Sequence, residues 1–186
     1  MREIFKPVIV LLIVCVVISF FVAYVFNITE DTISEIEKAA NEKLMSAVLP
    51  DGNPFEDITL EVVSDATPTI SSVTINAVYS SQKGFVFNVS TKGYGGEVVV
   101  FVGINNDGTI NNVQVGKNNE TPSVGKKAEE KDFTGRFIGI DSKQNLKENV
   151  DTISGATITT RGVIEAVQEA CHYFSSYIEE VSKEEN

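Results

Sequence analysis

The sequence predicts an α+β fold, in which an N-terminal transmembrane helix precedes one domain made of an antiparallel sheet and flanking helices. Three observations lead to this prediction. An uncharged apolar run occupies residues 8–26. Short segments rich in β-branched residues follow it, and the chain closes with a segment of helical periodicity. A length of 186 residues accommodates one such domain and a short anchor, but not two separate cores.

Composition excludes several classes of protein. The 26 acidic residues outnumber the 15 basic ones, giving a net charge of −11, whereas a nucleic-acid-binding protein needs a basic face. We therefore expect no nucleic-acid partner. The two cysteines, Cys15 and Cys171, are too few for a disulfide framework or a thiolate-held iron–sulfur cluster. A single histidine, His172, predicts no metal site.

The apolar run 8–26 is long enough to cross a bilayer, since as a helix it would extend roughly 28 Å. A cleaved signal peptide usually has a shorter apolar core that ends in small residues, and the run here ends in Ala23-Tyr24-Val25-Phe26. A lipoprotein signal needs a small residue before its cysteine, but Val14 precedes Cys15. We therefore predict a retained anchor in the lipid bilayer.

Basic residues near the two ends of the run predict its orientation. Arg2 and Lys6 precede it, and the first basic residue after it is Lys38. Because positive charge is retained on the cytoplasmic side, residues 1–7 should be cytoplasmic and the rest of the chain extracytoplasmic. The expected location is the cell membrane, with a single pass.

A stalk or docking helix is expected over residues 27–50, between the anchor and a domain at 51–186. Thr32 and Glu35 have the spacing of a capping box, and Pro50-Asp51-Gly52 ends the helical pattern. One face of this helix is apolar, at Ile33, Ile36, Ala40, Leu44 and Val48.

Strands are predicted next, because the chain alternates β-branched or aromatic segments with turn residues. The strongest candidate is a hairpin over Glu97–Val115, which turns at Asn106-Asp107-Gly108 and whose apolar run 98–102 indicates burial on both faces. The other predicted strands are Ile58–Val63, Val73–Tyr79 and Phe85–Thr91.

The last third of the chain is predicted to hold a long irregular segment and a helix. Residues 116–150 are polar and rich in glycine, and a loop of this length is usually functional. An amphipathic helix should begin at about Thr160. Its predicted buried stripe is Val163, Val167, Ala170, Phe174, Ile178 and Val181.

The segment Asp151–Thr157, with the sequence DTISGAT, carries the clearest local chemistry. It is a Gly-Ala turn crowded with hydroxyl groups just before a predicted helix N-terminus, where free amides and the helix dipole favour an anion. Arg161 would add a charge-assisted contact. The alternative interpretation is an ordinary helix cap with several hydroxyls.

Residues Asp151–Thr157 also match D-x-x-S-G-A-T, the acceptor motif of proteins that carry covalent FMN on its final threonine. The region Lys92–Val167 resembles the FMN-binding domain of the G subunit of Rnf complexes, which are ion-pumping ferredoxin:NAD oxidoreductases. It is similar, more distantly, to the C subunit of sodium-pumping NADH:quinone reductase. Two further blocks carry the resemblance, Gly93-Tyr94-Gly95-Gly96 and Glu120–Lys126.

The resemblance implies roles for particular residues. Thr157 would hold FMN through a phosphoester that a flavin transferase makes. The transferase would recognise Asp151, Ser154, Gly155, Ala156 and Thr157. The expected FMN contacts are Gly95, Gly96, Glu120, Thr121, Lys126, Ser154 and Arg161. On the residues alone, Glu120 and Lys126 are equally compatible with solvated surface charge.

The sequence departs from the family pattern at three positions. Ser123 stands where the family usually has glycine, and Val124 where it has leucine. Glycine at position 123 would serve a positive φ or a close approach to the ring. Glu97 follows Gly96 where the family often has proline.

The resemblance implies an electron-transfer subunit of a membrane complex, with other membrane subunits as partners and no catalytic residues or turnover of its own. Two alternatives remain. One is a stand-alone, membrane-anchored FMN carrier for extracellular electron transfer. The other is a sensor or adhesion domain in which S-G-A-T is only a helix cap.

Overall fold

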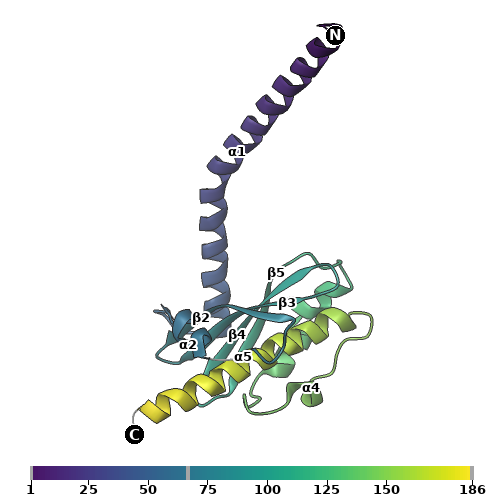
Figure 1. Cartoon of the computed structure of the whole chain (residues 1–186). Helices are drawn as coiled ribbons and strands as arrows, with labels where there is room; N and C mark the ends of the chain where they lie inside the picture. The colour runs from purple at the N-terminus through teal and green to yellow at the C-terminus, as the bar shows by residue number, and fades with distance from the viewer. Residues whose placement is uncertain (1, 66–67, 185–186) are drawn as a thin grey trace. The chain divides into compact units, whose positions relative to one another are not determined.

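The computed structural model describes residues 2–65 and 68–184. They divide into two compact units, Met1–Glu42 and Lys43–Asn186. Helix α1 (Arg2–Val48) supplies the first unit and enters the second, which holds all the other elements (Figure 1). These are β1 (Glu56–Asp57), α2 (Thr59–Asp65), β2 (Val73–Ser81), β3 (Gly84–Lys92), β4 (Glu97–Asn105), β5 (Ile110–Asn118), η1 (Gly125–Glu129), α3 (Lys131–Thr134), η2 (Gly135–Phe137), α4 (Leu146–Asn149) and α5 (Thr157–Glu184).

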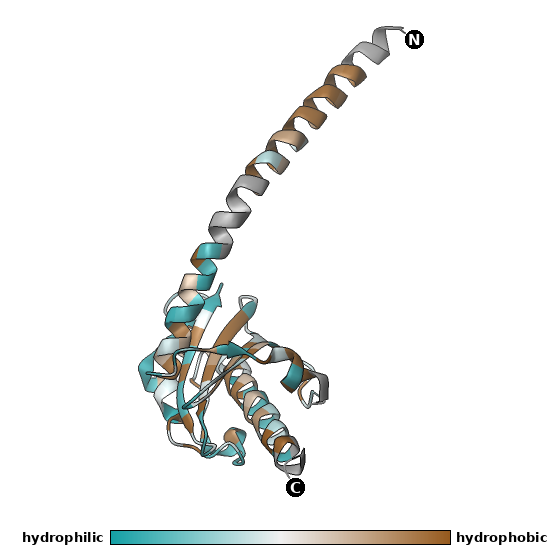
Figure 2. Cartoon of the chain, turned by 90° about the vertical axis from the view of Figure 1, so that its left-hand side faces the viewer, coloured by the Kyte–Doolittle hydropathy of each residue, from teal (hydrophilic) through white to brown (hydrophobic). Residues whose placement is uncertain are grey.

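The apolar run lies within α1. Residues Val8–Phe26 are helical, exposed, and long and apolar enough by length and composition to cross a membrane, as the brown segment in Figure 2 shows. The separate helix expected from Thr32 does not begin there, because α1 continues without a break through residues 27–34. No proline or glycine interrupts this stretch, so nothing stops the helix. The side chains of Thr32 and Ile33 lie outside the described residues.

The domain contains a five-stranded sheet in the order β1-β2-β3-β4-β5, and every neighbouring pair is antiparallel. The predicted strands at 73–79 and 85–91 and the hairpin at 97–115 are confirmed. The hairpin turns through Gly108, whose φ of +87° suits glycine. The α+β class with an antiparallel sheet is therefore confirmed.

The strand predicted over Ile58–Val63 was wrong, since Ile58 lies between β1 and α2 and the other residues belong to α2. Asp57 explains the helix start, because its carboxylate accepts hydrogen bonds from the amide and the hydroxyl of Thr59. Those bonds hold the pKa of Asp57 below its usual value. Ile58 and Val62 are buried four residues apart, a spacing that suits a helix face, and so short an apolar run does not distinguish helix from strand.

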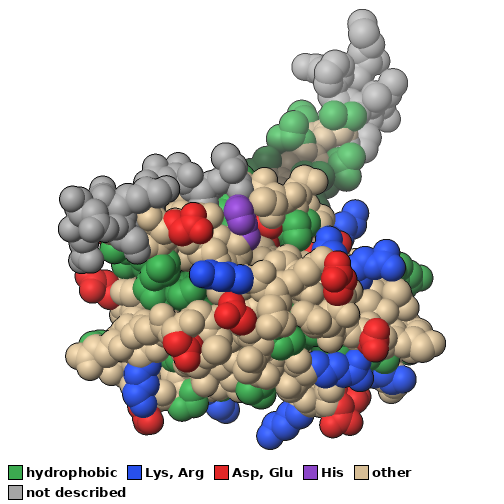
Figure 3. Space-filling model, turned by 90° about the horizontal axis from the view of Figure 1, so that it is seen from below, with side chains coloured by type: hydrophobic (Ala, Val, Ile, Leu, Met, Phe, Trp, Pro, Cys, Tyr) green, Lys and Arg blue, Asp and Glu red, His purple; other side chains and the backbone are tan. Residues whose placement is uncertain are grey.

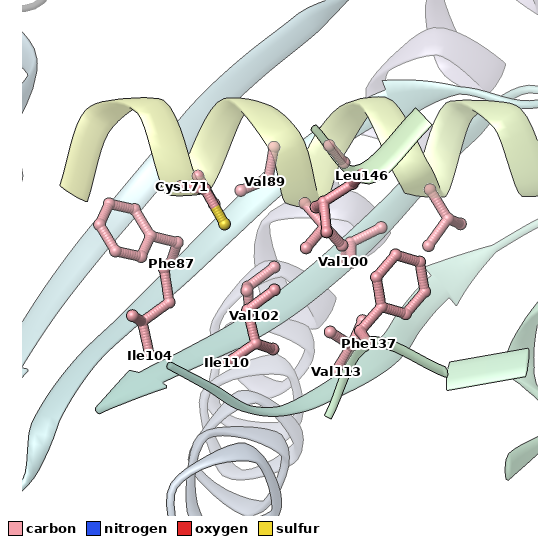
Figure 4. Packing of buried hydrophobic residues seen from close by; sticks show 14 of the residues in the cluster. Phe87, Val89, Val100, Val102, Ile104, Ile110, Val113, Phe137, Leu146 and Cys171 are labelled. Atoms are coloured by element: carbon pink, nitrogen blue, oxygen red, sulfur yellow. The ribbon is translucent and has the colours of Figure 1, made fainter. Parts of the chain in front are cut away.

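Strand β4 is buried on both faces, as its apolar run predicted. Val100, Val102 and Ile104 point into the core under α5, and Figure 4 shows them in the same cluster as Cys171 of that helix. Phe101 points the other way, into a second cluster with Val86 of β3 and the last turn of α1. The sheet therefore has a helix packed on each face, and α5 crosses one of them (Figure 1).

Helix α5 begins at Thr157, three residues earlier than expected, because Thr157 to Thr160 are already helical. The predicted stripe is buried at Val163, Val167, Ala170 and Phe174. Ile178 and Val181 are partly exposed, so the prediction of burial was wrong for these two residues.

Segment 116–150 is less irregular than expected, since it contains the end of β5 and the short helices η1, α3, η2 and α4. Phe133, Phe137 and Leu146 project from these helices into the main core and are fully buried. Sequence periodicity does not reveal helices of three to five residues. Burial of their large side chains holds the segment against the sheet.

Cys171 is buried in the main core and is not disulfide-bonded. Burial, with a smaller effect from Asp141, raises the pKa of its thiol to about 12. The thiolate is the reactive form of cysteine, so this residue is chemically inert in the folded domain.

On the face drawn in Figure 3, acidic and basic side chains are interspersed.

The last turn of α1 is fixed to β4 and β5 through its carbonyl groups. The Nδ2 atom of Asn111 donates to Val48 O at 2.7 Å, and that of Asn112 donates to Ala47 O at 3.0 Å. Gly103 permits the close approach, because a Cβ built there would lie 2.2 Å from Val48 O. These contacts satisfy carbonyls that the helix end leaves without partners.

The Gly103→Ala substitution should therefore lower the free energy of unfolding by roughly 2–3 kcal/mol, because the added methyl group meets backbone that has no room to move. Gly135→Ala is the matched control, since a Cβ there has no neighbour within 4 Å. Chemical denaturation of both variants measures the difference. Equal stabilities would show that α1 is not held tightly against the sheet.

Candidate functional site

A hollow of about 480 Å³ opens beside the N-terminus of α5. All three motif blocks border it, although they lie far apart in the sequence. Its lining residues are Tyr94, Glu120, Thr121, Val124, Gly125, Gly155, Ala156, Thr157, Ile158 and Thr159. The fold thus brings together the β3–β4 turn, the segment after β5 and the acceptor turn.

The Glu120 side chain connects these blocks. It is only 4% exposed, and both of its carboxylate oxygens accept hydrogen bonds. Oε1 accepts from the amide of Gly95 at 2.9 Å, and Oε2 accepts from the hydroxyl of Thr159 at 2.9 Å. A buried carboxylate requires such partners. Glu120 therefore joins the Gly-rich turn to the first turn of α5.

Three glycines surround this carboxylate closely. A Cβ built on Gly93 would lie 2.2 Å from Oε1 of Glu120, and one built on Gly125 would lie 2.1 Å from Oε2. A Cβ on Gly95 would lie 2.4 Å from the carbonyl oxygen of Asn119. The glycines of the first two motif blocks thus make room for Glu120 and for the backbone beside it.

The acceptor turn presents Thr157 as the first residue of α5. Gly155 adopts a φ of +84°, which explains the glycine of S-G-A-T, and Ala156 is buried. The hydroxyl of Thr160 accepts from the amide of Ile153 at 3.2 Å and donates to Ala156 O at 2.9 Å, which closes the turn. Thr157 is half-buried, and within the described part of the chain its hydroxyl makes only a long bond of 3.4 Å, to Ile153 O.

The predicted site residues divide into two groups. Thr157, Gly155, Ala156, Glu120 and Thr121 line the hollow.

The remaining predicted residues do not line it. Ser154 and Asp151 are exposed on the acceptor turn, and Arg161 is exposed on α5. Gly95 contributes through its bond to Glu120, whereas the carbonyl of Gly96 accepts from Gly93 at 2.7 Å.

Lys126 forms an ion pair with Glu129 at 3.6 Å, and its amide donates to Thr121 O. Lys126 is exposed and the Glu129 side chain is about one-third exposed, so solvent screens the pair and it adds little stability.

Sequence reasoning missed the apolar rim of the hollow. Tyr94, Val124 and Ile158 are 75%, 44% and 57% exposed, although large apolar side chains are usually buried. They come from three separate elements and border the same space as Thr157. Each of them lies within or directly beside a motif block, and that position was the only indication the sequence offered.

Sequence reasoning also missed Thr159, which lies two residues after the acceptor threonine. Its hydroxyl is buried and donates to Glu120. The three threonines at the start of α5 therefore have different structural roles. Thr160 closes the turn, Thr159 holds Glu120, and Thr157 borders the hollow.

The hollow suits FMN in size and chemistry. Its volume lies within the range typical of small-molecule and cofactor sites. The apolar rim suits the face of a flavin ring. The first-turn amides of α5 lie beside the Thr157 hydroxyl, and helix N-termini favour phosphate. No cluster of three or more metal-ligating side chains occurs among the residues that the structure describes.

The antiparallel sheet is crossed by one long helix, α5, and the hollow lies at the N-terminus of that helix. Residues 93–172 match the family described as the FMN-binding domain. This match falls on the region whose motifs predicted the resemblance, and it confirms the resemblance there.

Relatives align along nearly the whole chain. The sequence is 29% identical over 183 residues to the G subunit of the ion-translocating oxidoreductase complex of Methanosarcina acetivorans, covering 94% of this chain and 96% of the relative. It is 28% identical over 185 residues to the G subunit of the Na(+)-translocating ferredoxin:NAD(+) oxidoreductase complex of Acetobacterium woodii, covering 89% of each. The crystal structure of Shewanella oneidensis NqrC matches with a TM-score of 0.44 and 20% identity, covering 61% of this chain and 69% of that one.

The contact between Gly125 and Glu120 gives a stability prediction. Gly125→Ala should lower the free energy of unfolding by roughly 2–3 kcal/mol, because its methyl group would displace a carboxylate held by two hydrogen bonds. In a Glu120→Gly background the same substitution should cost little, because both the carboxylate and the Cβ of residue 120, which lies 2.9 Å from the added methyl group, are then absent. Additive effects of the two substitutions in denaturation measurements would contradict this close packing around Glu120.

Ser123 gives a second prediction. Its φ is +66°, so serine occupies the left-handed conformation at the position where the family usually has glycine. Ser123→Gly should stabilise the domain by about 0.5–1 kcal/mol. Ser71→Gly, at an exposed turn position without a positive φ, is the control and should be neutral or destabilising. Melting temperatures of the two variants test the difference in sign.

Proposed function

We propose that this protein carries FMN covalently on Thr157 and transfers electrons as a subunit of a membrane-bound, ion-translocating ferredoxin:NAD oxidoreductase. The observation that carries the proposal is the position of Thr157, where the three motif blocks border one hollow of suitable size and chemistry. The full-length relatives support the complex, because their names place them in ion-translocating oxidoreductase complexes.

The attachment step joins the Thr157 hydroxyl oxygen to the flavin phosphate. The new bond is Oγ1–P, and the bond that breaks is a P–O bond of a flavin phosphoanhydride donor, whose remaining phosphate-bearing part leaves. The hydroxyl proton is released, so the protein gains the mass of FMN less water. A separate flavin transferase catalyses this step. The hydroxyl becomes available once its long contact with Ile153 O is broken.

Each described element of the site would hold one part of the flavin. The first-turn amides of α5 would hold a phosphate attached to Thr157, and the exposed Arg161 would add positive charge on the same helix. Tyr94, Val124 and Ile158 provide apolar contact for the ring. Thr121 offers a hydroxyl at the edge of the hollow.

Glu120 fixes the wall of the hollow through Gly95 and Thr159, and each of its oxygens retains a further lone pair that could face the flavin. Bound FMN supplies the redox chemistry by accepting and passing electrons. The protein excludes water and fixes the position of the ring.

The N-terminal helix gives the protein its proposed location. Val8–Phe26 would cross the cell membrane once, with Arg2 and Lys6 on the cytoplasmic side and the FMN-binding domain outside. A covalent link prevents loss of the cofactor outside the cell. The isolated subunit should show flavin redox behaviour but should not reduce NAD.

The test is the intact mass of the denatured full chain after co-expression with a flavin transferase. The wild type should gain the mass of FMN less water, and Thr157→Ala should gain nothing because it lacks the acceptor oxygen. Thr152→Ala is the control, since it removes an exposed hydroxyl from the same block without touching the acceptor.

No mass gain in a folded wild-type chain, beside a transferase that labels another acceptor, would overturn the proposal. It would favour the sensor or adhesion function, in which S-G-A-T is only a helix cap. Labelling of Thr157→Ala would place the flavin elsewhere.

A further inference from the structure

Arg136, in the short η2 turn, is tied to the acceptor turn through backbone atoms. Its Nη1 atom donates to the carbonyl oxygen of Asp151 at 2.8 Å, and its Nε atom donates to the carbonyl oxygen of Asp132 at 3.0 Å. Its guanidinium carbon lies 5.7 Å from the ring centroid of Phe133. Two hydrogen bonds and a ring contact therefore fix a long side chain in one orientation.

Phe133, against which the Arg136 side chain packs, is itself held firmly in the core. Its ring is fully buried and packs edge-on against Phe137 at 5.5 Å between centroids. Arg136 thus connects the acceptor turn to the main core, although its own side chain is exposed.

The acceptor turn is consequently held at both ends. Arg136 binds the carbonyl of Asp151 at its start, and Thr160 binds the amide of Ile153 and the carbonyl of Ala156 toward its end. Peptide groups are planar, so fixing the carbonyl of Asp151 fixes the plane between residues 151 and 152. The direction in which the Asp151 side chain leaves the backbone is thereby restricted.

The Asp151 carboxylate itself is free to meet a partner. It is exposed and has no hydrogen bond or ion pair within the described part of the chain. The printed bond from Arg136 goes to the backbone carbonyl of this residue, which leaves the exposed carboxylate accessible to another protein.

We infer that Arg136 is a positioning residue for flavin attachment, because it orients Asp151 for the transferase relative to the Thr157 hydroxyl. This inference rests on the proposed function. Arg136 acts through the residue-151 peptide and makes no contact with the transferred group. Its loss should therefore slow attachment without preventing the domain from folding.

The test compares the rates at which full-length variants of this protein acquire flavin. Each variant is incubated with purified transferase and its flavin phosphoanhydride donor, and the labelled fraction is measured over time by intact mass. For Arg136→Gln, kcat/KM for the acceptor protein should fall by roughly three- to tenfold, as expected for loss of one solvent-exposed hydrogen bond. Arg136→Lys should recover part of the loss, since it keeps one donor. Lys131→Gln removes an exposed positive charge from the neighbouring α3 and should leave kcat/KM unchanged. Unfolding midpoints of all variants are measured in parallel.

A double-mutant cycle with Asp151→Asn separates positioning from other roles. If Arg136 acts by orienting Asp151, Arg136→Gln should have little further effect once the Asp151 carboxylate is replaced. A full additional loss in that background would show that Arg136 contacts the transferase or the flavin directly, and would overturn the inference. So would a kcat/KM for Arg136→Gln equal to that of Lys131→Gln, or a loss explained by a lowered unfolding midpoint.

These outcomes are distinct from failure of the proposed function. If the wild type acquires no flavin, attachment to Thr157 is refuted, and with it the role of Arg136. If the wild type is labelled and Thr157→Ala is not, the proposed attachment stands whatever Arg136→Gln does.

Discussion

The buried carboxylate of Glu120 is the interaction on which the site depends. It accepts one hydrogen bond from the turn after β3 and one from the first turn of α5, and it lies in the segment after β5. Three separate parts of the chain therefore meet at one side chain. Removing that side chain would leave the buried hydroxyl of Thr159 without its carboxylate partner, at a cost of about 1–3 kcal/mol. The hollow beside Thr157 exists because these parts are held together.

This arrangement changes the interpretation of the motif glycines. Glycine-rich turns are commonly associated with direct approach to a phosphate, yet Gly93 and Gly125 are required here by the space that Glu120 occupies. Gly155 is different, because its positive φ shapes the acceptor turn itself. Glycine thus serves two structural purposes in the site, and neither requires contact with the ligand.

Sequence patterns predicted most of the fold because burial imposes clear periodicity. The apolar span, the hairpin and the long final helix each follow such a pattern, and each is present. The prediction failed at Ile58–Val63, where a short apolar run was compatible with both helix and strand and Asp57 decided the outcome. The short helices of 125–149 follow no period that a sequence window detects.

The motifs predicted the acceptor turn and Thr157, but not how the site is supported. Thr159 and Arg136 act through hydrogen bonds to residues 39 and 15 positions away, and such partners become visible only in three dimensions. The apolar rim was also missed, because Tyr94 and Ile158 gain meaning only from the hollow that they share. The departure at Ser123 was informative, since serine retains the positive φ for which glycine is suited.

An experimental structure of the full chain after flavin attachment tests the central claim most directly. The account predicts that the ring lies in the hollow bordered by Tyr94, Val124 and Ile158. It also predicts that Glu120 keeps its hydrogen bonds to Gly95 and Thr159. A ring placed outside this hollow, or a Glu120 side chain that leaves both partners to bind the flavin, would contradict the account.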